Sequence, residues 1–202
     1  MDTTTVLNTE ITDALQKSMT YQDFLDKVTT LHEEGKVTGD TQSEDLLNYT
    51  NLNLRRLKRW NKTLKVSDDV KETIANYSKK VHWIVVAEGW CGDVAHILPV
   101  IHKAAELNDN INLRIVLRDQ NVAFMDHFLT NGARSIPKLV MVDQETLEVL
   151  HVWGERPAPA IKLIKDYKEE HGIVDETVKE ELQHWYNSDK GQTTLKELTA
   201  LL

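Results

Sequence analysis

A chain of 202 residues with 41% hydrophobic residues can form one domain with additions, and this composition excludes global disorder. The net charge of −8 disfavours a general binder of nucleic acid or of anionic membranes, because such binders need a positive surface. The single cysteine excludes an internal disulfide and a zinc site built from cysteine clusters. Any redox chemistry must therefore finish on another molecule.

Residues 1–78 are predicted to form a helical N-terminal extension. Thr20 caps a first helix with apolar residues at helical spacing, a leucine stripe from Leu47 to Leu64 marks a second, and Ser67 opens a third. The basic residues of the second helix run from Arg55 to Lys65, and we interpret them as a solvated helix face, with RNA contact as the alternative. No Pro/Gly/Ser linker follows residue 78, so we expect the extension to pack on the rest.

The middle of the chain, residues 79–172, alternates strands and helices. The apolar run 81–87 is typical of a central strand covered on both faces. The expected elements are strand 81–87, helix 92–107, strand 111–117, helix 122–129, strands 139–142 and 147–153, and a helix from Pro157 to about Glu170 that ends at Gly172. Residues 173–202 are predicted to be C-terminal helices packed on this domain.

The only cysteine, Cys91, directly follows the buried-type strand and precedes a helix. Its thiol is therefore expected at a helix N-terminus, where free backbone amides and the helix dipole favour a thiolate. Gly89 and Gly92 have no side chains and leave room for other groups to approach the turn closely, and Trp90 shields one side of the thiol. The alternative is an inert cysteine of the core.

These residues resemble the thioredoxin superfamily over positions 80–170. Trp90-Cys91-Gly92 matches the first three residues of the Trp-Cys-Gly-Pro-Cys motif, and Pro99 falls where the family kinks its active-site helix. Ser135-Ile136-Pro137 is similar to the cis-proline loop, with an ordinary trans proline as the alternative. The resemblance implies an α/β, thioredoxin-like fold: a central mixed sheet flanked by helices, here with added N- and C-terminal helices. It also implies that Ile136 and Pro137 face the thiol and hold a substrate backbone.

The departures from the family pattern bear on activity. Asp93 and Val94 stand where the motif has its proline and second cysteine, and Val85 and Ile115 replace the aspartate and lysine that assist proton transfer. Without a second cysteine the chain cannot resolve a mixed disulfide by itself. We expect the Asp93 carboxylate, as an exposed acid of the first helical turn, to offset only part of the helix effect on the thiol pKa. Glu88 is expected at the rim, with a proton relay as the alternative.

The chain as a whole resembles a bacterial subgroup that carries Trp-Cys-Gly-Asp and a helical N-terminal extension. Three functions follow as hypotheses: a single-cysteine thiol-disulfide oxidoreductase acting through mixed disulfides, a non-catalytic binding module for a protein partner, and an iron–sulfur carrier resembling monothiol glutaredoxins. Cys91 is the expected catalytic residue. The expected substrate groove consists of Trp90, Gly92, Asp93, Ile136 and Pro137.

We expect no cofactor and no metal site, because His96 and His102 are six residues apart on one helix and do not share a face. The expected partner is a protein or a low-molecular-weight thiol or disulfide, with no nucleic acid and no membrane. The absence of a secretory signal and of any apolar run of ~18–20 residues favours a cytoplasmic location. The sequence leaves the oligomeric state open.

Overall fold

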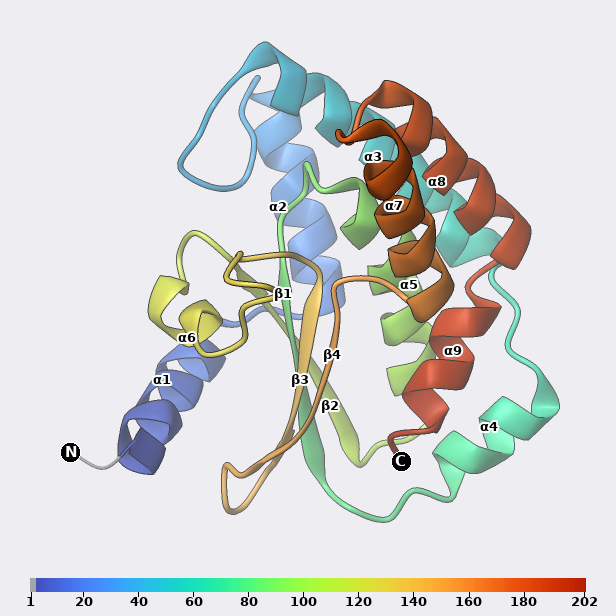
Figure 1. Cartoon of the computed structure of the whole chain (residues 1–202). Helices are drawn as coiled ribbons and strands as arrows, with labels where there is room; N and C mark the ends of the chain where they lie inside the picture. The colour runs from blue at the N-terminus through green and yellow to red at the C-terminus, as the bar shows by residue number, and fades with distance from the viewer. Residues whose placement is uncertain (1–2) are drawn as a thin grey trace.

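A computed structural model describes residues 3–202, and within them a four-stranded mixed sheet is surrounded by helices (Figure 1). The strands are β1 Val81–Ala87, β2 Ile111–Leu117, β3 Lys138–Asp143 and β4 Val149–Gly154. The helices are α1 Thr3–Lys17, α2 Tyr21–Glu33, α3 Glu44–Thr63, α4 Asp68–Ala75, α5 Gly92–Ala105, α6 Val122–Asp126, α7 Ala158–His171, α8 Glu176–Asp189 and α9 Gln192–Thr199.

The sheet order is β2-β1-β3-β4, which places β1 in the interior. β1 pairs parallel with β2 and antiparallel with β3, and β3 pairs antiparallel with β4. The continuous apolar sequence of β1 suits this position, because both of its faces are covered and six of its seven residues are buried. The expected α/β class with a central mixed sheet is confirmed.

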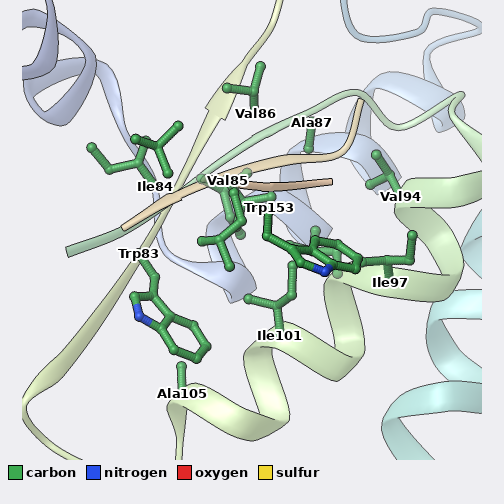
Figure 2. Close-up of a cluster of buried hydrophobic side chains, with 14 of the residues drawn as sticks. Trp83, Ile84, Val85, Val86, Ala87, Val94, Ile97, Ile101, Ala105 and Trp153 are labelled. Atoms are coloured by element: carbon green, nitrogen blue, oxygen red, sulfur yellow. The ribbon is translucent and has the colours of Figure 1, made fainter. Parts of the chain in front are cut away.

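Helix α5 covers one face of the sheet, together with α7 and α9, while α1 and α6 lie on the opposite side (Figure 1). Alternation along β1 directs Trp83 and Val85 toward α5. Figure 2 shows Trp153 beside the α5 residues Ile97 and Ile101, and Trp83 beside Ala105 at the other end of α5. This packing fixes α5, and therefore the residues at its N-terminus, relative to the end of β1.

The N-terminal helices pack on the sheet domain through defined contacts. α3 lies against α5, α2 against α3, and α1 against α6. The link between α1 and α2 also pairs with the edge of the sheet, since the backbone amides and carbonyls of Met19 and Ile115 exchange two hydrogen bonds of 2.9 Å. This bridge covers part of an edge strand that would otherwise present free backbone groups.

Several element boundaries differ from the sequence expectation. The helix α1 was not identified separately. α6 ends at Asp126 instead of 129, and α5 ends at Ala105 instead of 107. β4 begins at Val149 instead of 147, because Leu147 has a φ of 60° and cannot continue a strand. In residues 3–202, no helix has the length and apolar character needed to span a membrane.

Candidate functional site

Cys91 is the N-cap residue of α5 and is partly exposed. Its backbone is extended, with φ −77° and ψ 121°. The thiol donates a hydrogen bond to the carbonyl oxygen of Ile136, at an Sγ–O distance of 3.5 Å. The peptide bond between Ile136 and Pro137 is cis, and both residues are buried. The structure therefore brings Cys91 and the Ile136-Pro137 loop together.

The loop before Cys91 is held by the segment that precedes α3. The amide of Gly89 donates to Thr38 Oγ1 at 2.8 Å, and Trp90 Nε1 donates to the Thr38 carbonyl at 3.0 Å. A Cβ atom on Gly89 would lie 2.8 Å from Val28 Cγ1, so α2 can approach this closely only because residue 89 is glycine. Arg118 lies over the Trp90 ring at 4.8 Å. Thr38 was not identified from the sequence.

Asp93 is buried, with 8% of its surface exposed, and the expectation of an exposed first-turn acid is wrong. Arg156 Nη2 lies 2.7 Å from Asp93 Oδ2, and the Tyr186 hydroxyl donates to Asp93 Oδ1 at 2.7 Å. These two partners come from the β4–α7 loop and from α8, far along the chain. They hold a negative charge in the first turn of α5, two residues from the thiol.

The environment of Cys91 opposes thiolate formation. Burial raises the pKa of the thiol from 9.0 to about 12, and the Asp93 carboxylate contributes to the increase. Three groups lower the pKa of the thiol: the backbone amides of Val94 and Asp93, and the Arg156 guanidinium. Together they do not offset the increase from burial and from Asp93. The expectation that the helix N-terminus would favour the thiolate, with only partial cancellation by Asp93, is therefore wrong. The first reason is the burial of the thiol itself, and the second is that Asp93 is buried and poorly screened by solvent.

Glu88 is fully buried, so its expected place at the rim is also wrong. Its Oε1 accepts a hydrogen bond from the Asp119 amide at 3.2 Å, while its Oε2 is buried without a hydrogen-bond partner among the described residues. Burial raises the pKa of this carboxyl group. Glu88 lies beneath the contact between Asp40, in the loop before α3, and Asp119, in the loop after β2, and it does not line the pocket beside Cys91.

A series of hydrogen bonds between largely buried side chains connects α3, α5 and α8. Trp60 Nε1 donates to His96 Nδ1 at 3.0 Å, and His96 Nε2 lies 2.7 Å from Gln183 Oε1. Because the tryptophan nitrogen can only donate, Nδ1 accepts, and the proton of the neutral imidazole sits on Nε2 and is donated to Gln183. The His96 ring stacks on Tyr186, with ring centroids 4.4 Å apart. Burial lowers the pKa of His96 to about 3.

A pocket of about 490 Å³ opens beside Cys91, between α3 on one side and α7 and α8 on the other. Trp90, Gly92 and Asp93 also line it, whereas the buried Ile136 and Pro137 do not. The remaining lining residues are Tyr49, Leu52, Arg56, Arg156, Ile164, Val174, Glu176, Lys179, Glu180, Leu182 and Gln183. A larger surface hollow of about 830 Å³ lies near Arg59 and Lys190 and contains none of the expected site residues.

Two features of this pocket were missed in the sequence. Arg56 was grouped with the exposed basic residues of its helix, although it lies three residues after the buried Asn53 and four before the buried Trp60. That helical spacing is the signal that could have placed it on the inner face. Arg156 and Tyr186 carry no local signal that would connect them with Asp93. Within residues 3–202, no group of three or more His, Cys, Asp or Glu side chains could hold a metal ion.

Comparison with known proteins gives the family and the fold. Residues 39–168 match the sequence model of a family described as Thioredoxin. A protein of unknown function from Pseudomonas aeruginosa is similar in structure, with a TM-score of 0.58 and 15% identity, covering 86% of this chain and 95% of that chain. An HIV epitope scaffold has a TM-score of 0.56 and 16% identity, with the same two coverages. No curated protein matches the chain.

Proposed function

The chain belongs to the thioredoxin family, and we propose that it acts as a non-catalytic binding module that holds a segment of a protein partner in the pocket beside Cys91. The observation that carries this proposal is the buried Asp93 carboxylate, which Arg156 and Tyr186 fix in the turn that follows the thiol. A nucleophilic cysteine needs the thiolate form. Here the Asp93 carboxylate, two residues from the thiol, adds to the effect of burial in raising the pKa of Cys91.

The neutral thiol is compatible with the hydrogen bond that it donates to Ile136, because a thiolate could not donate it. Burial and the Asp93 carboxylate raise the pKa of the thiol, so the neutral form predominates at neutral pH. Val94, at the position of a second cysteine, is 1% exposed and provides no resolving group. For thiol–disulfide exchange, Cys91 would need to be a thiolate, and a second thiol in the chain would be needed to release the product from the mixed disulfide. The protein has neither feature.

The pocket itself has the properties of a binding site. Its volume of about 490 Å³ lies within the usual range of ligand pockets, and its walls include the apolar side chains of Leu52, Ile164 and Val174. Leu52 and Val174 are 45% and 42% exposed, and Tyr49, on the same rim, is 40% exposed. Exposed apolar side chains gathered around a cavity are typical of a surface that a partner covers.

The proposal can be tested by peptide selection. Random peptides displayed on phage are selected on the full-length protein, and the enriched peptides are measured by titration calorimetry. We expect micromolar binding that survives Cys91→Ser and is lost in Leu52→Glu, which puts a charge on an exposed position of the pocket wall. Val152→Glu, an equally exposed apolar residue on β4, is the matched control and should leave binding unchanged. A selection without enrichment, or binding that requires the thiol, would contradict the proposal.

One observation favours the oxidoreductase alternative: Cys91 is partly exposed in an open pocket and lies next to the cis Ile136-Pro137 bond. In that function the thiol would attack a mixed disulfide and an external thiol would release the product. Mass spectrometry after incubation with oxidised glutathione separates the two functions. The binding module remains unmodified while the denatured chain gains one glutathione, whereas an oxidoreductase is modified in its native state.

A further inference from the structure

Among the three cations that line the pocket beside Cys91, Arg56 is the one that forms no ion pair with a carboxylate of the described residues, whereas Arg156 and Lys179 each do. Asp93 is paired with Arg156 at 2.7 Å, and Glu176 with Lys179 at 2.6 Å. The only hydrogen bond of the Arg56 guanidinium among the described residues runs from Nη1 to Asn53 Oδ1, at 2.9 Å. Arg56 is only partly exposed, so its charge is less well solvated than that of the exposed lysines nearby.

Arg56 is also placed where an incoming anion would be stabilised. Its Nη1 lies 3.6 Å from the position of a Cβ atom on Gly92, the first residue of α5. Its charge therefore adds to the positive end of the α5 dipole. Burial lowers the pKa of Arg56, and the charge of Arg59 acts in the same direction, whereas the Asp93 carboxylate acts against them.

The apolar wall adjoins this cation. Leu52 and Tyr49 precede Arg56 on the same helix by one and two turns, and both are exposed. Val174, which follows the C-cap Gly172 of α7, lines the facing side of the pocket. The acidic Glu180 is exposed, so solvent screens its charge, and Glu176 is neutralised by Lys179. Among the described residues, the pocket thus offers an apolar surface that ends at a cation in ion-pair contact with no carboxylate, while Asp93 is engaged by Arg156.

We propose that the partner segment is a peptide that places an acidic side chain on Arg56 and apolar side chains on Tyr49, Leu52 and Val174. This inference rests on the proposed binding function and specifies its ligand. The carboxylate would accept hydrogen bonds from the guanidinium in a bidentate arrangement, which lysine cannot reproduce. The neighbouring apolar side chains of the peptide would fill the cavity over Cys91. No covalent step is involved.

The same peptide selection tests this inference. We expect the enriched peptides to contain an aspartate or glutamate close to two or more apolar residues. A synthetic peptide of that composition should bind Arg56→Gln about tenfold more weakly than the parent, and replacing its acidic residue by the amide should produce the same loss. Applied together, the two changes should cost no more than one alone. Raising the salt concentration should weaken parental binding more than that of Arg56→Gln.

Matched variants separate this role from a structural one. Arg55→Gln removes an exposed charge one position away and should leave the affinity unchanged. Arg56→Lys keeps the charge and should recover part of the affinity, and far-ultraviolet circular dichroism establishes that each variant is folded. Enriched peptides without acidic residues, or equal affinities of the Arg56→Gln and Arg55→Gln variants, would overturn the inference and leave the binding function intact. A selection without any enrichment would overturn both.

Discussion

The hydroxyl of Tyr186 donates a hydrogen bond to the carboxylate of Asp93 across 2.7 Å, although 93 residues separate them in the chain. Both side chains are buried, so the bond joins α8 to the first turn of α5 in a region of low dielectric constant. Arg156 binds the other carboxylate oxygen. The position of one wall of the pocket and the charge next to Cys91 therefore depend on the same carboxylate.

Tyr186→Phe should destabilise the protein by about 2 kcal/mol, because it removes one hydrogen bond to a buried carboxylate while leaving the aromatic packing in place. Urea denaturation followed by circular dichroism measures the change in the free energy of unfolding. Tyr49→Phe removes the hydroxyl of an exposed tyrosine on the pocket rim and should change this free energy by less than about 0.5 kcal/mol. Equal stabilities of the two variants would show that the bond to Asp93 does not stabilise the fold.

The folded protein should lose stability in mild acid through His96. Its folded pKa of about 3 lies below the usual value of 6.5, so below about pH 6.5 the unfolded chain takes up a proton that the folded chain does not. Protonation at Nδ1 would also direct a second donor at Trp60 Nε1. The free energy of unfolding should therefore fall by about 1.4 kcal/mol for each pH unit below 6.5 from this group alone.

His82 and His102 add to the acid effect, because burial lowers the pKa of each. The contribution of His96 is therefore measured as a difference between variants, by urea denaturation at about pH 7 and pH 5. His96→Gln should be less stable at neutral pH but should show a smaller loss on acidification. His151→Gln, at an exposed position of β4, should keep the full loss. Identical losses in the parent and His96→Gln would contradict the assignment.

The central features of the fold could be predicted from short-range patterns. Three features set the local backbone structure of only a few neighbouring residues: the apolar run of β1, the glycines around Cys91 and the proline of the Ile136-Pro137 loop. Such local features can be recognised from their spacing in the sequence. The helix α1 was not recognised because five threonines within its first ten residues lower its helix propensity. Its buried Ile11 and Ala14 show that packing on the domain compensates for this.

The electrostatics of the site could not be predicted in the same way. Asp93 occupies the first turn of a helix, where acids are common and usually exposed, and nothing nearby in the sequence indicates its burial. Its partners Arg156 and Tyr186 belong to the β4–α7 loop and to α8, and only the tertiary fold brings them to Asp93. Glu88 is similar: its position after β1 indicated a rim residue, whereas the loop from Thr38 to Asp40 covers it. Such contacts depend on tertiary packing.

Asp93→Asn should make Cys91 more reactive. The change removes a negative charge close to the sulfur and leaves Arg156 to favour the thiolate, so the pKa of the thiol should fall. A fall of one pKa unit would raise the rate of alkylation by iodoacetamide about tenfold at mildly alkaline pH. The rate is followed by mass spectrometry of the native protein. The variant should also lose about 3 kcal/mol of stability, because Arg156 loses one of its two carboxylate partners.

Glu180→Gln is the control for that experiment, since it removes an exposed carboxylate from the same pocket. Its alkylation rate should equal that of the parent because solvent screens the charge. Circular dichroism at the reaction pH distinguishes a change of thiol pKa from unfolding. If Asp93→Asn is folded and reacts no faster than Glu180→Gln, then Asp93 does not control the ionisation of Cys91.

The pH titration of the Cys91 thiol tests most directly the claim that this cysteine is a neutral wall of a binding pocket. The ultraviolet absorbance of the thiolate is recorded for the parent and for Cys91→Ser, and the difference isolates the only cysteine of the chain. Burial and Asp93 predict that the difference stays near zero through about pH 10 and rises only toward the pKa of about 12. An inflection at or below the unperturbed value of ~8.5 would show that the thiolate is accessible at physiological pH and would contradict the binding-module account.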